Sequence, residues 1–137
     1  MNNDIKNALR TDRTIDIITT GAKTGLPRTT EIWFTNIKGR IIICGTPSAD
    51  GKDGRPRRGR DWLANLKANP EFLFCFKESL NVQLPARAVP IVDPAERRQI
   101  MTAPETKWYR DQVASVEDLI EGSPIVEVFF KDFSDEA

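Results

Sequence analysis

The sequence predicts a single domain, residues 1–137, of mainly β structure, in which six mostly antiparallel strands form a compact barrel with small flanking helices. Three observations predict it. Apolar residues fall in short runs of strand length, turn-forming residues separate these runs, and the helical segments between them are short. A length of 137 residues suits one domain with a real core better than two.

The first third of the chain is expected to hold a short helix and three strands. The helix covers residues 3–10, and strands follow over residues 14–20, 29–37 and 40–45. The third strand, RIIICG, is apolar on both faces, which predicts a central strand. We expect these three strands to form an antiparallel meander.

The middle of the chain begins with a loop over residues 46–60, TPSADGKDGRPRRGR, which has no hydrophobic side chain larger than alanine. We expect this loop to be exposed and mobile, because it cannot bury apolar surface. Asp61 then resembles the N-cap of a helix over DWLANLKAN. Strands are expected over residues 71–77 and 81–92, and Pro85 and Pro90 favour an edge or interrupted position for the second.

The last third is expected to hold two helices and the sixth strand. Asp93 and Pro94 have the order of an N-cap and a first helical residue, and that helix should end near Thr102. A less regular segment with Trp108 and Tyr109 follows. A short helix over residues 115–121 and a strand over residues 124–131 complete the chain.

The composition restricts the chemistry, because the chain has no histidine. This excludes Ser-His-Asp and Cys-His nucleophile systems, and no cluster of cysteines or carboxylates has the spacing of a metal site. Chemistry carried by a bound cofactor is then the expectation. The two cysteines, Cys44 and Cys75, are predicted to be buried reduced thiols. With no apolar run of membrane-spanning length and no apolar N-terminal signal, we expect a cytoplasmic protein without a membrane partner.

The segment GAKTGLPR, between the first two strands, is longer than a hairpin turn requires. Its glycines would let backbone N–H groups turn toward one point, and Lys23, Thr24 and Arg28 add cations and a hydroxyl. Thr29 and Thr30 contribute further hydroxyl groups. Phosphate is the ligand that such a set fits best. The alternative is a surface turn with ordinary charged residues.

The charges are unevenly distributed along the chain. Residues 22–60 hold nine lysines and arginines against three acids, whereas residues 111–137 hold eight acids and one lysine. This predicts a basic face, although the same cluster could be a solvated surface. The run RPRRGR could suggest nucleic-acid binding, but it has no interleaved aromatic residue for base stacking, so no nucleic-acid partner is predicted.

Two residues of the segment DWLANLKANP are candidate ligand contacts. Asn65 could face a ligand or cap backbone groups, and Trp62 could border a cofactor or belong to the core.

Together, TTGAKTGLPRTTEIWF and DWLANLKANP resemble the deazaflavin-dependent nitroreductase family over residues 13–92. This is a group of split β-barrel oxidoreductases similar to pyridoxamine phosphate oxidases. The resemblance implies a split β-barrel that binds the 8-hydroxy-5-deazaflavin coenzyme (coenzyme F-420), or in some relatives FMN, haem or another ligand. It implies that Lys23, Thr24 and Arg28 hold the phosphate and anionic tail of the cofactor. Thr46, Trp62 and Asn65 match positions that border its ring.

The resemblance leads to a functional hypothesis with an alternative. The chain would transfer hydride from the reduced deazaflavin to a small quinone-, nitro- or enone-type acceptor. The loop cations, Arg60 among them, would bind the cofactor tail. Tyr109, the only tyrosine, would be the proton donor, since its segment is expected near the barrel mouth. The alternative is a non-catalytic split-barrel module that carries FMN, haem or another small ligand. A homodimer is expected by analogy.

Overall fold

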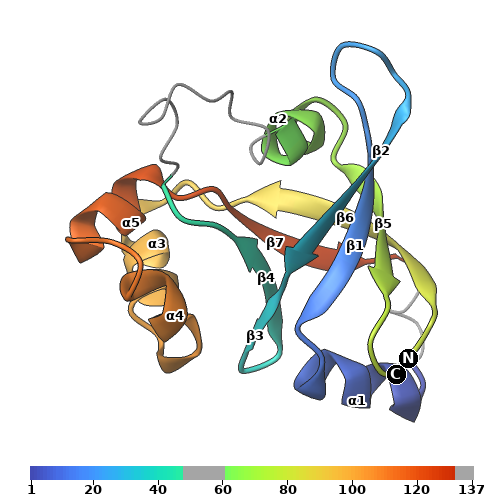
Figure 1. Ribbon diagram of the computed structural model, residues 1–137, viewed down its shortest axis with the longest axis horizontal. Helices are drawn as coiled ribbons and strands as arrows, with labels where there is room; N and C mark the ends of the chain where they lie inside the picture. Colours follow the sequence, from blue (N-terminus) through green and yellow to red (C-terminus); the bar gives the residue numbers. More distant parts are fainter. Residues whose placement is uncertain (48–60, 132–137) are drawn as a thin grey trace.

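The computed structural model describes residues 1–47 and 61–131, and it contains one curled antiparallel sheet that forms a half-barrel (Figure 1). The strand order is β2-β1-β5-β6-β7-β4-β3. The bounds are β1 (Thr14–Thr20), β2 (Pro27–Trp33), β3 (Thr35–Ile37), β4 (Arg40–Cys44), β5 (Glu71–Phe76), β6 (Gln83–Pro90) and β7 (Ile125–Phe130). The predicted class is therefore confirmed, with seven strands among the described residues instead of six.

The additional strand arises because the predicted strand over residues 29–37 divides at Phe34. β2 pairs with β1 and β3 pairs with β4, so both antiparallel pairings of the predicted meander occur. They lie at opposite ends of the strand order, so the three predicted strands are not side by side. The Phe34 side chain is 3% exposed and its ring lies 5.3 Å from that of Phe74 inside the barrel. Burial of this ring accompanies the bend that carries the chain from one edge of the sheet to the other.

β6 lies inside the sheet, between β5 and β7, so the predicted edge position is wrong. Its alternating exposure places Leu84, Ala86 and Ala88 in the interior. Pro85 is tolerated because its carbonyl faces the end of β7, where it accepts from the backbone N–H of Lys131 at 3.0 Å. A backbone N–H at position 85 would point to the same side, where the hydrogen bonds between β6 and β7 end, so its absence from proline costs little.

β4 is apolar on both faces because it separates two hydrophobic clusters. Ile41 and Ile43 belong to the main core inside the barrel, and Ile42 and Cys44 belong to a second core under the C-terminal helices. The sequence RIIICG predicts a central strand, and β4 lies inside the sheet, between β7 and β3, one place from its edge.

The helices close the ends and one side of the half-barrel (Figure 1). Their bounds are α1 (Asn3–Thr11), α2 (Asp61–Ala68), α3 (Pro94–Met101), the 3-10 helix η2 (Pro104–Thr106), α4 (Lys107–Arg110) and α5 (Val116–Gly122). The predicted cap of α3 is confirmed, since the Asp93 carboxylate accepts from the backbone N–H of Glu96 at 2.9 Å. α2 lies beside the connection from β1 to β2, whereas α3, α4 and α5 pack together beside β4 (Figure 1). None of the helices described is long and apolar enough to cross a bilayer.

Candidate functional site

A cavity of about 230 Å³ lies between the β1–β2 connection and α2. Its lining residues are Gly21, Ala22, Lys23, Thr24, Arg28, Ala64 and Asn65. Four residues predicted from sequence therefore meet at one place, although Asn65 is far from the others along the chain. We call Lys23, Thr24 and Arg28 the cradle.

The β1–β2 connection is held by hydrogen bonds within itself. The N–H of Gly21 donates to the carbonyl of Leu26 at 2.8 Å, and the N–H of Gly25 donates to the carbonyl of Gly21 at 2.9 Å. The N–H of Leu26 donates to Oγ1 of Thr24 at 3.2 Å. The N–H groups of the two glycines are therefore used within the turn and do not face an anion. The side chains of the cradle remain as donors, and the Thr24 hydroxyl still has a proton to donate.

Both glycines of this connection have a specific structural reason. Gly25 has a φ of 70°, a backbone conformation that residues with a side chain rarely adopt. A Cβ on Gly21 would lie 2.6 Å from Oγ1 of Thr24 and 3.3 Å from the carbonyl oxygen of Leu26. A larger residue at position 21 would therefore displace a hydroxyl of the cradle.

Asn65 joins the connection to α2. Its side chain is buried, at 6% exposed, and its Oδ1 accepts from the N–H of Ala22 at 2.8 Å. Its Nδ2 donates to Oγ1 of Thr19 at 3.2 Å, and that hydroxyl donates to the carbonyl of Arg28 at 3.4 Å. Asn65 therefore holds the backbone before Lys23 directly and the backbone of Arg28 through Thr19, so it positions the cradle.

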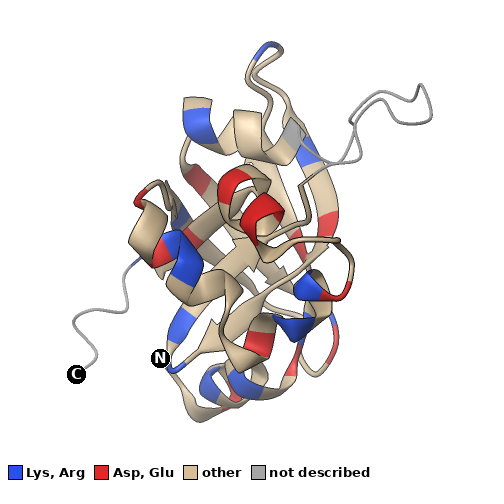
Figure 2. Cartoon of the chain, turned by 90° about the vertical axis from the view of Figure 1, so that its left-hand side faces the viewer, with Lys and Arg blue, Asp and Glu red and all other residues tan. Residues whose placement is uncertain are grey.

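The cradle concentrates positive charge without a matching acid. Lys23 and Arg28 are exposed, and neither forms an ion pair with any residue in the described ranges. No carboxylate lines the cavity. In Figure 2 the tip of the β1–β2 connection is blue, whereas α5 carries red segments. This arrangement can bind a phosphate by charge and by hydrogen bonds from the side chains.

The structure places three other predicted residues away from the cradle. Thr29 pairs with Ile18, whereas Arg28 pairs with Thr19, so the Thr29 side chain lies on the other face of the sheet. Trp62 is 4% exposed and belongs to the main core. Thr46 follows Gly45, whose N–H donates to the carbonyl of Pro124 at 3.1 Å, and so lies by the junction of α5 and β7. Arg60 and the other loop cations lie outside the described residues.

Tyr109 is not near the barrel mouth, and that part of the prediction is wrong. Its side chain is 3% exposed and lies in the second core together with Cys44. Burial raises the pKa of Tyr109 well above its ordinary value, and the neighbouring Cys44 raises it further. Burial also raises the pKa of Cys44 to about 12. Both groups therefore stay protonated at neutral pH.

Sequence reasoning missed Thr19 and Ala64. Thr19 could have been found, because it is a polar residue at an inward position of a strand that otherwise places isoleucines there. Ala64 offered no signal, since a small exposed helical residue has many uses.

Three solved structures share this fold at low sequence identity. A protein named for 5-nitroimidazole antibiotic resistance from Bacteroides thetaiotaomicron is 10% identical, with a TM-score of 0.64 over 95% of this chain and 80% of that one. The conserved hypothetical protein Rv2991 from Mycobacterium tuberculosis is 16% identical, with a TM-score of 0.60 over 96% of this chain and 81% of that one. A pyridoxinephosphate oxidase family protein from Clostridium acetobutylicum is 14% identical, with a TM-score of 0.58 over 92% and 80%. These similarities support the split-barrel fold.

A family model shows more than the fold. It is described as F420H(2)-dependent quinone reductase and matches residues 3–124, which include the β1–β2 connection and α2. The match confirms the resemblance to deazaflavin-dependent reductases and makes the chain an oxidoreductase that uses coenzyme F420. The chain belongs to the F420H(2)-dependent quinone reductase family.

Proposed function

We propose that the chain transfers a hydride from reduced coenzyme F420 to a small quinone-, nitro- or enone-type acceptor, with the phosphate of the coenzyme bound at the cradle. The observation that carries the proposal is the pair Lys23 and Arg28, two cations that line one cavity with no described carboxylate partner. The positive charge of such a pair is balanced when an anion binds between the two side chains.

The residues present fit the phosphate end of the coenzyme. Lys23 supplies a point charge, Arg28 a bidentate fork and Thr24 a hydroxyl donor. A cavity of about 230 Å³ is smaller than the ~300–1,000 Å³ usual for a complete small-molecule ligand. We therefore assign the cradle to the phosphate alone, with the remainder of the coenzyme extending beyond it.

The chain contributes binding and orientation. When bound, the reduced deazaflavin supplies a hydride. The cradle neutralises the phosphate charge, and Asn65 fixes the cradle against α2 so that the cofactor is held in one orientation. With no histidine in the chain, an imidazole cannot assist. The role of Tyr109 as proton donor stays a prediction, and its burial in the second core favours a packing role instead.

The experiment has two arms. Titration with coenzyme F420 and with FMN, followed by cofactor fluorescence, should give the lower Kd for coenzyme F420. Loss of absorbance of the reduced coenzyme is then followed with a panel of quinones, nitroaromatics and enones. Turnover above the buffer rate with at least one acceptor supports the proposal. Tighter binding of FMN, or oxidation at the buffer rate with every acceptor, would contradict it.

We further propose a homodimer that forms through the outer face of β6 and β7. Val89 and Phe129 expose 40% and 48% of their surface on this face. Arg87 lies opposite Phe129 on this face, whereas Glu127, opposite Val89, is already paired with Arg40 within the chain, so Val89 and Phe129 would provide the contact with a second copy. Light scattering should give a dimer mass for the wild type and a monomer mass for Phe129→Ser. A wild-type monomer at all concentrations would contradict the proposal.

A further inference from the structure

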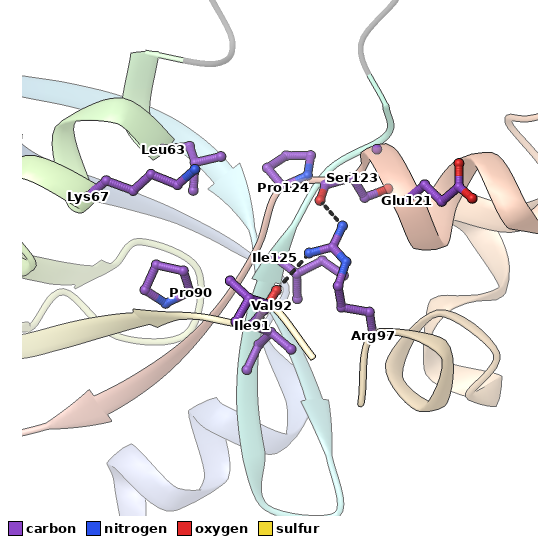
Figure 3. A pocket seen from close by; sticks show the side chains of 11 residues that line it. Leu63, Lys67, Pro90, Ile91, Val92, Arg97, Glu121, Ser123, Pro124 and Ile125 are labelled. Atoms are coloured by element: carbon purple, nitrogen blue, oxygen red, sulfur yellow. Dashed lines mark hydrogen bonds between the residues drawn. The ribbon is translucent and has the colours of Figure 1, made fainter. Parts of the chain in front are cut away.

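A second, larger cavity of about 360 Å³ lies on another face of α2 (Figure 3). Leu63 and Lys67 line it from α2 and lie one helical turn apart, so they share a face that differs from that of Ala64 and Asn65. The other walls come from the end of β6, from α3 and from the junction of α5 and β7. This cavity shares no lining residue with the cradle.

Arg97 presents a fixed guanidinium to this cavity. Its Nη1 and Nη2 donate to the carbonyls of Ile91 and Ser123 at 2.7 and 2.6 Å (Figure 3). Its Nε donates to the carbonyl of Ile120 at 2.7 Å. Three of its five N–H groups are therefore used, and two are left for a ligand. No carboxylate in the described part of the chain forms an ion pair with it. The three carbonyls hold the cation in place without neutralising its charge.

Ser123 adds a hydroxyl that the fold leaves unused. Its side chain is 3% exposed, and its Oγ has no hydrogen-bond partner among the described residues. Both of its backbone groups are satisfied, since its N–H donates to Leu119 and its carbonyl accepts from Arg97. A buried hydroxyl without a partner is rare in folded proteins. The Ser123 Oγ is closed off from solvent in this rotamer although the residue lines the cavity, so a ligand would engage the hydroxyl after the side chain rotates toward the cavity.

The remaining lining determines the class of that ligand. Lys67 is a second cation, with no ion-pair partner among the residues that the structure describes. The one acid of the lining, Glu121, turns its carboxylate away from the other labelled side chains in Figure 3. The rest of the wall is apolar: Leu63, Pro90, Ile91, Val92, Pro124 and Ile125.

We propose that this cavity binds a small organic anion, a carboxylate on an apolar body. The carboxylate would accept hydrogen bonds from Arg97 and Lys67, and from Ser123 once its side chain rotates toward the cavity. The apolar body would lie against the prolines and aliphatic side chains. An inorganic anion would leave the apolar wall unused, and a neutral apolar molecule would leave three donors unpaired. The site goes beyond the reductase function and does not depend on it.

The test uses benzoate as the probe and the full chain. Calorimetric titration should show saturable binding of benzoate, at least tenfold tighter than binding of benzyl alcohol or inorganic phosphate. Ser123→Ala and Lys67→Gln should each raise the Kd for benzoate three- to tenfold. The matched surface variant Lys6→Gln and the cradle variant Lys23→Gln should bind benzoate like the wild type. Arg97 is left unchanged because the fold depends on its three backbone contacts.

Thermal unfolding distinguishes the ligand role of Ser123 from a structural one. Removal of a buried hydroxyl that has no partner should leave the melting temperature unchanged or raise it, while the affinity for benzoate falls. The proposal is overturned if benzoate fails to saturate, if benzyl alcohol binds equally well, or if Ser123→Ala and Lys67→Gln both retain the wild-type Kd.

Discussion

Asn65→Ala should destabilise the protein and weaken cofactor binding together, because one side chain joins α2 to the cradle. The substitution removes the acceptor for the N–H of Ala22 and the donor to Oγ1 of Thr19. A net hydrogen bond contributes about 0.5–1.5 kcal/mol, and two are lost. The expected decrease in the free energy of unfolding is therefore about 1–3 kcal/mol.

The cofactor affinity should fall because Arg28 is positioned through the same network. Its carbonyl accepts from the Thr19 hydroxyl, and that hydroxyl also accepts from Asn65. Urea unfolding, followed by tryptophan fluorescence, measures the stability, and fluorescence titration measures the Kd for coenzyme F420. Asn69→Ala, one helical turn further along, is the matched control, because the described contacts include no hydrogen bond from its side chain.

A double-mutant cycle with Thr19→Val isolates the contact between the two side chains. We expect a coupling energy of about 0.5–1.5 kcal/mol, since the pair is buried and directly bonded. The reasoning is refuted if Asn65→Ala is no less stable than Asn69→Ala, or if it loses stability yet binds the coenzyme with the wild-type Kd.

Three further predictions concern the cores. Phe34→Ala should lower the free energy of unfolding, measured by urea denaturation, by about 3–5 kcal/mol, because it removes the buried ring at the bend between β2 and β3. A decrease of less than about 1 kcal/mol would show that the ring does not stabilise the bend. The free energy of unfolding should fall as pH rises from about 9 toward 12, because the folded state keeps the Cys44 thiol protonated while the unfolded state loses that proton. In thermal melts, Cys44→Ala should reduce this dependence of the melting temperature on pH. Tyr109→Phe should keep the wild-type turnover number, and a large loss of turnover at unchanged Kd would instead make Tyr109 the proton donor.

Local signals explain what the sequence could predict. The alternation of Ile15 and Ile17 identifies β1, and the Asp93–Pro94 pair identifies the start of α3. The glycines and cations of GAKTGLPR identify the cradle. Each of these features is determined by residues within a few positions of one another.

Tertiary contacts explain what the sequence could not predict. The bend at Phe34 has no glycine or proline to mark it, and the strand alternation continues through it. The Asn65–Ala22 bond joins residues 43 positions apart, so no local pattern reveals it. Tyr109 was expected near the barrel mouth, yet it is buried with Ile42 and Cys44 of β4 in the second core.

The central claim is that the cradle binds the phosphate of the cofactor. The most direct test compares the Kd of coenzyme F420 with that of its deazaflavin riboside, which lacks the phosphate and the tail, in the wild type and in the Lys23→Ala/Arg28→Ala double variant. Because both side chains are exposed, we expect a loss of about 1–3 kcal/mol for the coenzyme. The riboside should bind both proteins equally. An equal loss for the two ligands, or no loss for either, would contradict the claim.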